Sequence, residues 1–110
     1  MRQGEIWFAD LNPAKGSEQS GSRPVVVVSG NTLNDALPIV IVVPMTSKVK
    51  SYPTCVLVRP NHINGLKKSA EAIPFQIRTI AKKRLTKRIG RITPDELQEI
   101  IRGLFVSLTH

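Results

Sequence analysis

The apolar residues of this chain fall into short runs of the kind found in β-strands. Alternating apolar and polar positions predict a first strand over Glu5–Leu11, ended by the pair Asn12-Pro13. The β-branched runs Val25–Val28 and Ile39–Val43 predict strands buried on both faces, with Pro44 ending the second. Further short strands are expected over residues 54–59, 71–73, 79–81 and 87–92, and a helical turn over residues 31–37.

One amphipathic helix is expected after the last strand. Thr93 suits the N-cap position, Pro94 suits the first turn, and Glu96 completes a capping box with Thr93. The apolar residues that follow recur at helical spacing and should pack against the strands: Leu97, Ile100, Ile101, Leu104, Phe105 and Leu108. The pattern predicts a mainly β domain of the α+β class, a small barrel or rolled sheet closed by a C-terminal α-helix. With 110 residues, the chain should form one domain over 1–110.

Positive charge is concentrated in the middle and the second half of the chain. Sixteen Lys and Arg residues oppose eight Asp and Glu residues, which gives a net charge of +8 and a pI near 10.3. Between residues 36 and 94 there are twelve basic residues and one acid, Glu71. Such an excess favours a polyanionic partner, which can be a nucleic acid, an anionic membrane surface or an acidic protein. The alternative is a solvated basic face that serves solubility.

Other classes of protein are disfavoured. The single cysteine, Cys55, lies in an apolar run, which indicates a buried thiol in a reducing compartment, and the cytoplasm is the expected location. His62 and His110, together with that cysteine, match no familiar metal-ligand spacing, so we expect neither a metal nor a cofactor. No apolar stretch approaches the roughly 20 residues of a membrane span, so no membrane contact is expected.

Two loops hold side chains that suit chemistry on a phosphodiester. The segment Gly16–Pro24 carries an acid, an amide, hydroxyls and one guanidinium, and it runs directly into the first β-branched strand. If the two β-branched strands pair, Arg23 lies near Thr46 at one end of the sheet, and Glu18 and Ser47 can join them. An arginine can bind phosphate oxygens, a carboxylate can accept the proton of a ribose hydroxyl, and a threonine can hydrogen-bond to the phosphate. This set favours RNA, which carries its own nucleophile in the 2′-OH.

Ordered motifs run through nearly the whole chain. They are Gly4-Glu5-Ile6-Trp7, Asp10-Leu11-Asn12-Pro13, Gly16-Ser17-Glu18-Gln19, Gly21-Ser22-Arg23-Pro24-Val25, Pro44-Met45-Thr46-Ser47, Gln76-Ile77-Arg78-Thr79-Ile80 and Lys83-Arg84-Leu85. Together with the terminal helix, these motifs resemble those of the MazF/PemK family. The string G-S-E-Q-x-G-x-R-P is specific to that pattern, unlike a lone glycine motif.

The resemblance implies a toxin of a toxin–antitoxin pair. Members of the family form an SH3-like barrel, of the kind also found in CcdB, and assemble as homodimers. They cleave single-stranded RNA at short sequences without a metal. A cognate antitoxin inhibits them by placing its largely acidic tail in the RNA site. The expected partners of this chain are therefore single-stranded RNA, an antitoxin with an acidic tail and a second copy of the chain.

The resemblance also assigns roles to individual residues. Arg23 and Thr46 match the family's catalytic arginine and threonine, and Glu18 matches an acid implicated in catalysis in some members. RNA contacts are implied for four further positions: Ser17, Gln19, Ser47 and Gln76. Arg78, in the same late motif, is a further RNA-binding candidate, with a structural pairing to Glu71 or to a backbone carbonyl as the alternative.

This chain departs from the family pattern at one place. Some members have an arginine and an aspartate just before the Q-x-R-T-I block, where this chain has Ile73 and Phe75. The aspartate of those members therefore cannot act as the base here. The general base stays open, with Glu18 as the leading residue.

Two other functions remain open at the level of sequence. The first is a non-enzymatic gyrase poison of the CcdB type, which shares the fold. The resemblance places that activity in C-terminal residues ending Trp-Gly-Ile, whereas this sequence has Val106-Ser107-Leu108-Thr109-His110 there. The second is a catalytically idle module that binds nucleic acid or an antitoxin.

Overall fold

Seven strands and a long C-terminal helix make up most of the described chain. The computed structural model describes residues 1–12 and 21–110. In chain order the elements are β1 (Glu5–Asp10), β2 (Ser22–Val27), α1 (Asn31–Ala36), β3 (Ile39–Thr46), β4 (Val56–Val58), β5 (Ala70–Ala72), the 3₁₀ helix η1 (Pro74–Gln76), β6 (Arg78–Ala81), the 3₁₀ helix η2 (Lys82–Arg84), β7 (Leu85–Arg91) and α2 (Pro94–Thr109). The mainly β architecture with a C-terminal helix is confirmed.

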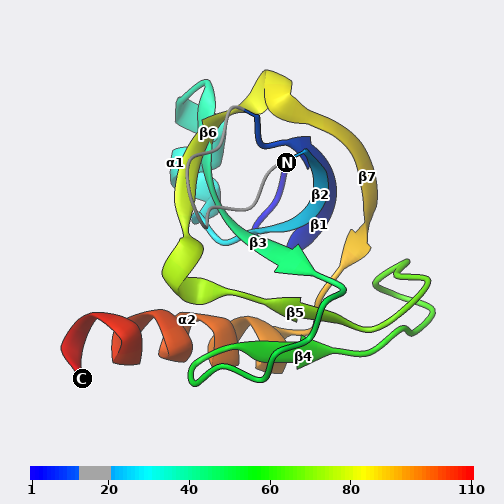
Figure 1. Ribbon diagram of the computed structural model, residues 1–110. Helices are drawn as coiled ribbons and strands as arrows, with labels where there is room; N and C mark the ends of the chain where they lie inside the picture. Colours follow the sequence, from blue (N-terminus) through cyan, green and yellow to red (C-terminus); the bar gives the residue numbers. More distant parts are fainter. Residues whose placement is uncertain (13–20) are drawn as a thin grey trace.

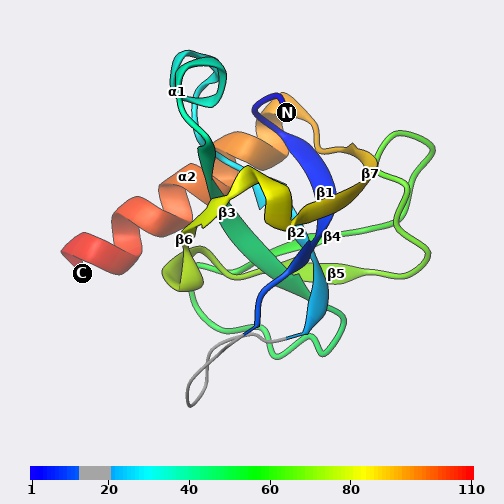
Figure 2. The same ribbon diagram turned by 90° about the horizontal axis from the view of Figure 1, so that it is seen from above.

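Part of the antiparallel sheet curls into a ring (Figure 1). The ring follows the order β6–β3–β2–β1–β7. Its two edge strands, β6 and β7, are joined through the single turn η2, so the chain closes the ring where strand pairing does not. The short strands β5 and β4 continue from the far end of β3, and α2 lies across them (Figures 1 and 2).

Strand β3 continues two residues beyond Pro44, where the sequence pattern predicted its end. That prediction was wrong because β3 changes partners at this proline. Residues 39–42 pair with β6, and Met45 and Thr46 pair with β5. The carbonyl of Pro44 accepts a hydrogen bond from Ile73 N (3.0 Å), so the N–H that proline lacks would face the gap between β6 and β5. No ladder bond is required in that gap, and the strand tolerates a proline there.

The β-branched residues of β2 are buried on both faces of the sheet, as predicted. Val25, Val26 and Val27 each have an exposed fraction of 0%. Val25 and Val27 belong to a hydrophobic cluster with Leu11 and Val40, whereas Val26 belongs to a second cluster that includes Ile100 of α2. Both faces of strand β2 are therefore packed against hydrophobic clusters, which makes the strand a rigid support for a functional side chain at its end.

Helix α2 begins at the predicted capping box. The Thr93 hydroxyl accepts a hydrogen bond from Glu96 N (3.1 Å), and the Glu96 carboxylate accepts one from Thr93 N (2.8 Å). The expectation that the whole apolar stripe packs inward was wrong for half of it. Ile100 is buried, but the exposed fractions of Ile101, Phe105 and Leu108 are 40%, 63% and 76%.

A close backbone contact explains which side of α2 faces the sheet. A Cβ on Gly103 would lie 2.3 Å from the carbonyl oxygen of Thr54, so the helix touches the chain before β4 through this glycine. One turn later the Ser107 hydroxyl donates to the Thr54 hydroxyl (2.9 Å). The side defined by Ile100, Gly103 and Ser107 is thus turned inward. The side that carries Phe105 faces outward.

Candidate active site

Arg23 and Thr46 lie at the same end of two paired strands. The antiparallel register pairs Val27 with Val42 and continues to Val25 opposite Pro44. Arg23 and Thr46 each lie two residues beyond that pair. Arg23 also pairs with Ala9 of β1, which fixes its backbone from the other side. The β-branched strands therefore pair as the sequence argument required, and they bring these two residues to one end of the sheet.

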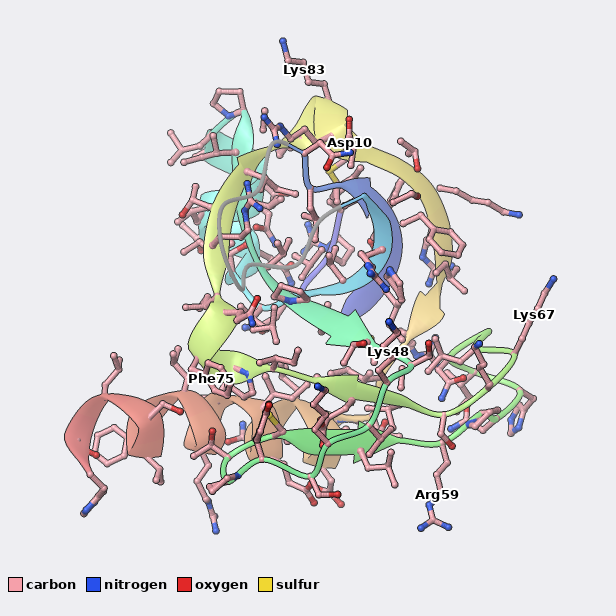
Figure 3. All side chains as sticks on the ribbon, in the orientation of Figure 1. Asp10, Lys48, Arg59, Lys67, Phe75 and Lys83 are labelled. Carbon is pink, nitrogen blue, oxygen red and sulfur yellow. The ribbon has the colours of Figure 1, made fainter. Side chains whose placement is uncertain are left out.

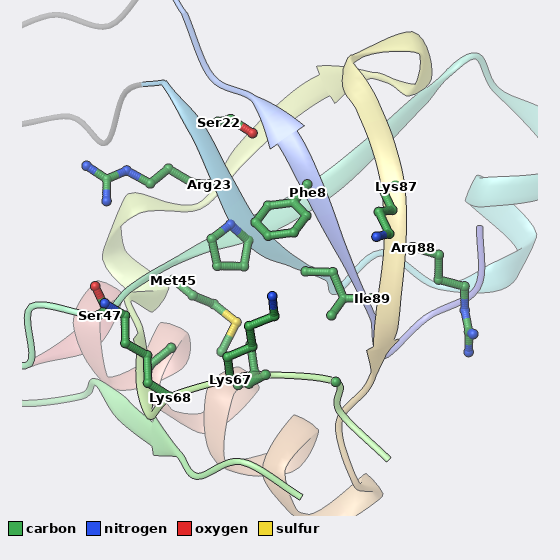
Figure 4. Close-up of a pocket in the computed structure, with 14 residues that line it drawn as sticks. Phe8, Ser22, Arg23, Met45, Ser47, Lys67, Lys68, Lys87, Arg88 and Ile89 are labelled. Carbon is green, nitrogen blue, oxygen red and sulfur yellow. The ribbon is translucent and has the colours of Figure 1, made fainter. Parts of the chain in front are cut away.

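A groove of about 500 Å³ opens beside Arg23 (Figure 4). Arg23 and Ser47 lie at one end of this groove, Phe8 lies in the middle and Lys87 lies at the other end. The groove combines basic side chains (Arg23, Lys67, Lys68 and Lys87) with apolar side chains (Phe8, Leu66 and Ile89). Basic groups suit a phosphate backbone and flat apolar groups suit unstacked bases, so the lining fits single-stranded nucleic acid.

The wall that carries Lys67 and Lys68 is a tightly built turn. Asn64 has an exposed fraction of 0%. Its side chain donates to the carbonyl of Arg59 (2.8 Å) and accepts from Leu66 N (3.0 Å). Gly65 has φ +68°, and a Cβ there would lie 2.3 Å from the carbonyl oxygen of Ile89 on β7. The turn is thus fixed to β7 through a contact that only glycine allows.

A second set of hydrogen bonds organises the chain that leaves β3. Thr46 has an exposed fraction of 7%, and its hydroxyl oxygen accepts a hydrogen bond from Lys48 N (3.1 Å). Glu71 of β5 has an exposed fraction of 3%, and it pairs with Thr46 in the β3–β5 register. Its two carboxylate oxygens accept hydrogen bonds from Lys50 N (3.1 Å) and Ser51 N (3.0 Å).

The chain on either side of residues 13–20 is held in place by backbone and side-chain contacts. Leu11 N donates to the carbonyl of Gly21 (3.0 Å), and Gly21 N donates to the Asn12 side chain (3.0 Å). Two arginines, one at the start of β6 and one in η2, hold the same place. Arg78 donates to the carbonyl of Leu11 (3.2 Å), and Arg84 donates to the carbonyl of Asn12 (2.7 Å). These two arginines thus contribute to the structure as well as to the positive charge of the chain.

Arg88 is also engaged within the protein. Its Nε donates to the Glu5 carboxylate at 2.8 Å, and its side chain points away from the groove in Figure 4. Burial by itself raises the pKa of Glu5. Hydrogen bonds from Arg2 N, Trp7 Nε1 and Arg88, together with the charge of Arg88, nevertheless hold that pKa below its usual value. Glu5 is therefore a carboxylate that fixes Arg88 and Trp7 in place.

The predicted site residues fall into three groups. Arg23, Thr46 and Ser47 lie at the same end of β2 and β3, where Arg23 and Ser47 line the groove and Thr46 is buried. Gln76 and Arg78 lie along the opposite edge of β3, where η1 and β6 follow β5. The remaining predicted residues, Ser17, Glu18 and Gln19, lie outside the described residues.

Four groove residues were not predicted from sequence: Phe8, Lys67, Lys68 and Lys87. The local signals were the pair Lys67-Lys68 directly after the turn at Gly65 and, for Lys87, the run of basic residues without an acid from Arg78 to Arg91. Their meeting with Phe8 depends on the contact between that turn and β7, which no local pattern encodes.

Three further findings concern metal ligands, membrane-spanning helices and the cysteine. Among residues 1–12 and 21–110, no three His, Cys, Asp or Glu side chains gather in a way that could hold a metal ion. In the same part of the chain no helix is long and apolar enough to cross a membrane. Burial, with a smaller contribution from the charge of Glu71, raises the pKa of the Cys55 thiol to about 11.

Comparison with known proteins identifies the family. The model of the PemK-like, MazF-like toxins of type II toxin–antitoxin systems matches residues 2–108. Endoribonuclease MazF9 of Mycobacterium tuberculosis is 41% identical over 114 residues, which cover 98% of this chain and 96% of that protein. A MazF crystal structure from Deinococcus radiodurans superposes with a TM-score of 0.86 at 26% identity, over 100% of this chain and 97% of that one. A MazE–MazF structure from the same organism gives a TM-score of 0.78 at 26% identity, over 98% and 95% of the two chains. The chain belongs to the PemK-like, MazF-like toxin family of type II toxin–antitoxin systems.

Proposed function

We propose that this chain is a sequence-selective endoribonuclease that cleaves single-stranded RNA, with Arg23 and Thr46 at its catalytic centre. The observation that carries the proposal is the position of both residues at one end of the β2–β3 pair, where Arg23 lines a basic groove. Membership of the toxin family and 41% identity to a protein named an endoribonuclease support the same activity.

The reaction uses the 2′-OH of the RNA as the nucleophile. Arg23 binds phosphate oxygens and stabilises the charge that grows on them in the transition state. Thr46 hydrogen-bonds to a phosphate oxygen, and Glu18 accepts the proton of the 2′-OH as general base. The new bond from the 2′ oxygen to phosphorus displaces the 5′ oxygen, which takes up a proton. The products are a 2′,3′-cyclic phosphate, or its hydrolysed form, and a 5′-OH fragment. This chemistry calls for neither a metal nor a cofactor.

RNA binding extends from the catalytic centre along the groove. Phe8 offers a ring on which a base can stack, and the lysines of the groove attract the phosphate backbone. Family resemblance implies further RNA contacts at Ser17, Gln19, Ser47 and Gln76, and Arg78 is a separate candidate in the same late motif. Of these, Ser47 lines the groove. Arg78 keeps further N–H donors beyond the one that it gives to the Leu11 carbonyl.

The partners follow from charge and from exposed apolar surface. A cognate antitoxin with an acidic tail suits a groove lined by basic side chains, and the solved structures similar to this chain include a MazE–MazF structure from Deinococcus radiodurans. A second copy of this chain suits the outer side of α2, where Ile101, Phe105 and Leu108 are exposed at helical spacing. The protein acts in the cytoplasm as a homodimer, and a Phe105→Glu variant should sediment as a monomer if this side of α2 forms the interface.

One experiment separates the proposed activity from its alternatives. Purified protein is incubated with a long single-stranded RNA in EDTA, and the fragments are mapped. Discrete cuts at a short sequence, ending in 2′,3′-cyclic phosphate or its hydrolysed form, are expected. Intact RNA together with inhibited DNA gyrase would favour a CcdB-like poison. RNA that is bound but not cut would favour an idle binding module.

A further inference from the structure

A buried carboxylate lies directly beside the proposed catalytic threonine. Glu71 and Thr46 are opposite residues in the β3–β5 register. Opposite residues of an antiparallel pair have side chains on the same face of the sheet. Their exposed fractions are 3% and 7%, so both side chains are withdrawn from solvent. The proposed reaction assigns no role to Glu71.

The hydrogen bonds of Glu71 explain how a carboxylate can be buried there. Burying a charged group is costly unless its oxygens are hydrogen-bonded. Each oxygen of Glu71 accepts one backbone N–H, from Lys50 at 3.1 Å and from Ser51 at 3.0 Å. Ser51 has φ +55°, a left-handed conformation that non-glycine residues seldom adopt. Glu71 therefore holds a strained backbone in a single arrangement.

The loop that Glu71 holds is the one that orients Thr46. Lys48 N donates to the Thr46 hydroxyl oxygen (3.1 Å), only two residues before the first backbone group bound by Glu71. A hydroxyl has one proton to donate and two lone pairs. Because Lys48 N occupies a lone pair, the Thr46 proton stays available for a phosphate oxygen. Ser47, which lines the groove, lies between Thr46 and Lys48.

We propose that Glu71 is a positioning residue for RNA cleavage. It fixes the backbone of residues 48–51, and that backbone sets the direction of the Thr46 hydroxyl. The inference rests on the proposed function, because it requires Thr46 to contact the phosphate. Glu71 itself touches neither the RNA nor the reacting atoms. Removing it should lower kcat and leave KM nearly unchanged, since the groove cations that bind RNA are not altered.

The test is a double-mutant cycle between Glu71→Gln and Thr46→Ala. Glutamine keeps the shape but offers one acceptor oxygen where two N–H groups need partners. In wild-type background, Glu71→Gln should lower the single-turnover rate roughly 10- to 100-fold, as expected for a displaced catalytic group. In the Thr46→Ala background the same change should cost less than about twofold, because coupled residues are not additive. Hydrogen exchange at Lys50 and Ser51 should accelerate in Glu71→Gln.

Asn34→Ala is the matched control. Asn34 is also a buried polar residue, 1% exposed, whose side chain donates to the carbonyl of Ser29 (2.9 Å). It lies after the opposite end of β2, so its loss should lower the melting temperature and leave the cleavage rate of the folded protein unchanged. If Glu71→Gln does not fold, Glu71→Asp keeps the charge and both oxygens but draws them back by one methylene group, and it should show the same pattern.

The outcomes separate this inference from the proposed function. Equal losses for Glu71→Gln in both backgrounds, or a normal kcat, would overturn the positioning role while Thr46 keeps its own. A loss that appears only in KM would place Glu71 in RNA binding and would also overturn it. A Thr46→Ala variant that cleaves at the wild-type rate would overturn both the catalytic role of Thr46 and the inference built on it.

Discussion

Replacing Gly90 with alanine should destabilise the fold and displace one wall of the groove. A Cβ at this position would lie 2.4 Å from the carbonyl oxygen of Ile63, 2.5 Å from Asn64 C and 2.6 Å from Asn64 O. All three are backbone atoms, so no side chain can rotate out of the way. The chain at Ile63 and Asn64 must withdraw from β7 instead, and it carries Lys67 and Lys68 of the groove with it.

The size of the effect follows from these contacts. Overpacking of a rigid site costs about 1–3 kcal/mol. The hydrogen bond from Arg91 N to the carbonyl of Ile63 (3.2 Å) spans the same contact and is lost when the chain withdraws. One such bond is worth about 1 kcal/mol. The sum of about 2–4 kcal/mol is a large share of a typical domain stability of roughly 5–15 kcal/mol. It corresponds to a fall of roughly 8–16 °C in melting temperature for a chain of this size.

Calorimetry and an RNA-binding titration measure the two consequences. Gly30→Ala is the control, because nothing lies within 4 Å of a Cβ built on Gly30. Gly30 is the N-cap of α1, where alanine is less favourable than glycine, so that variant should lose at most about 1 kcal/mol and should bind RNA like the wild type. A Gly90→Ala variant that melts within about 2 °C of the wild type, a shift of well under 1 kcal/mol, would show that the chain at Ile63 and Asn64 does not have to withdraw.

Three further changes test other parts of the account. Arg23→Ala should lower the single-turnover cleavage rate by about 10²–10³ with an unchanged melting temperature, and a loss of only a few-fold would contradict its catalytic role. Lys67→Ala should reduce the slope of log affinity for single-stranded RNA against log salt concentration by about 0.7. Lys83→Ala should leave that slope unchanged, because the Lys83 side chain projects on the far side of the ring from Lys67 (Figure 3). Because the pKa of Cys55 is raised to about 11, its thiol should be alkylated at pH 8 at least about tenfold more slowly than a free cysteine, and equal rates would contradict the burial argument.

The local parts of the fold could be predicted from sequence because their causes are local. The capping box of α2 depends on Thr93 and Glu96, three residues apart. The burial of β2 follows from its run of β-branched residues. The end of β3 could not be predicted, because Pro44 is tolerated only where β6 gives way to β5 as a partner. The outward side of α2 could not be predicted either, since the contact between Gly103 and Thr54 selects the inward side.

The candidate site was predictable to the extent that it depends on strand pairing. Once the two β-branched strands are paired, the positions of Arg23 and Thr46 follow from their distance to the end of each strand. The groove lysines and Glu71 depend on contacts between distant segments. Glu71 meets Lys50 across 21 positions of sequence, and its sequence neighbours give no sign of that contact.

Cleavage of an RNA oligonucleotide with a single deoxyribose 5′ of the scissile phosphate tests the central claim most directly. The chain should bind this substrate with nearly normal affinity, because the phosphate and base contacts remain. It should fail to cut it under single-turnover conditions, because the substrate's own 2′-OH is the nucleophile that Arg23 and Thr46 serve, and EDTA should not affect cleavage of the all-ribose strand. Cleavage of the deoxy-substituted strand at the normal rate would show that water attacks the phosphate, and it would contradict the account.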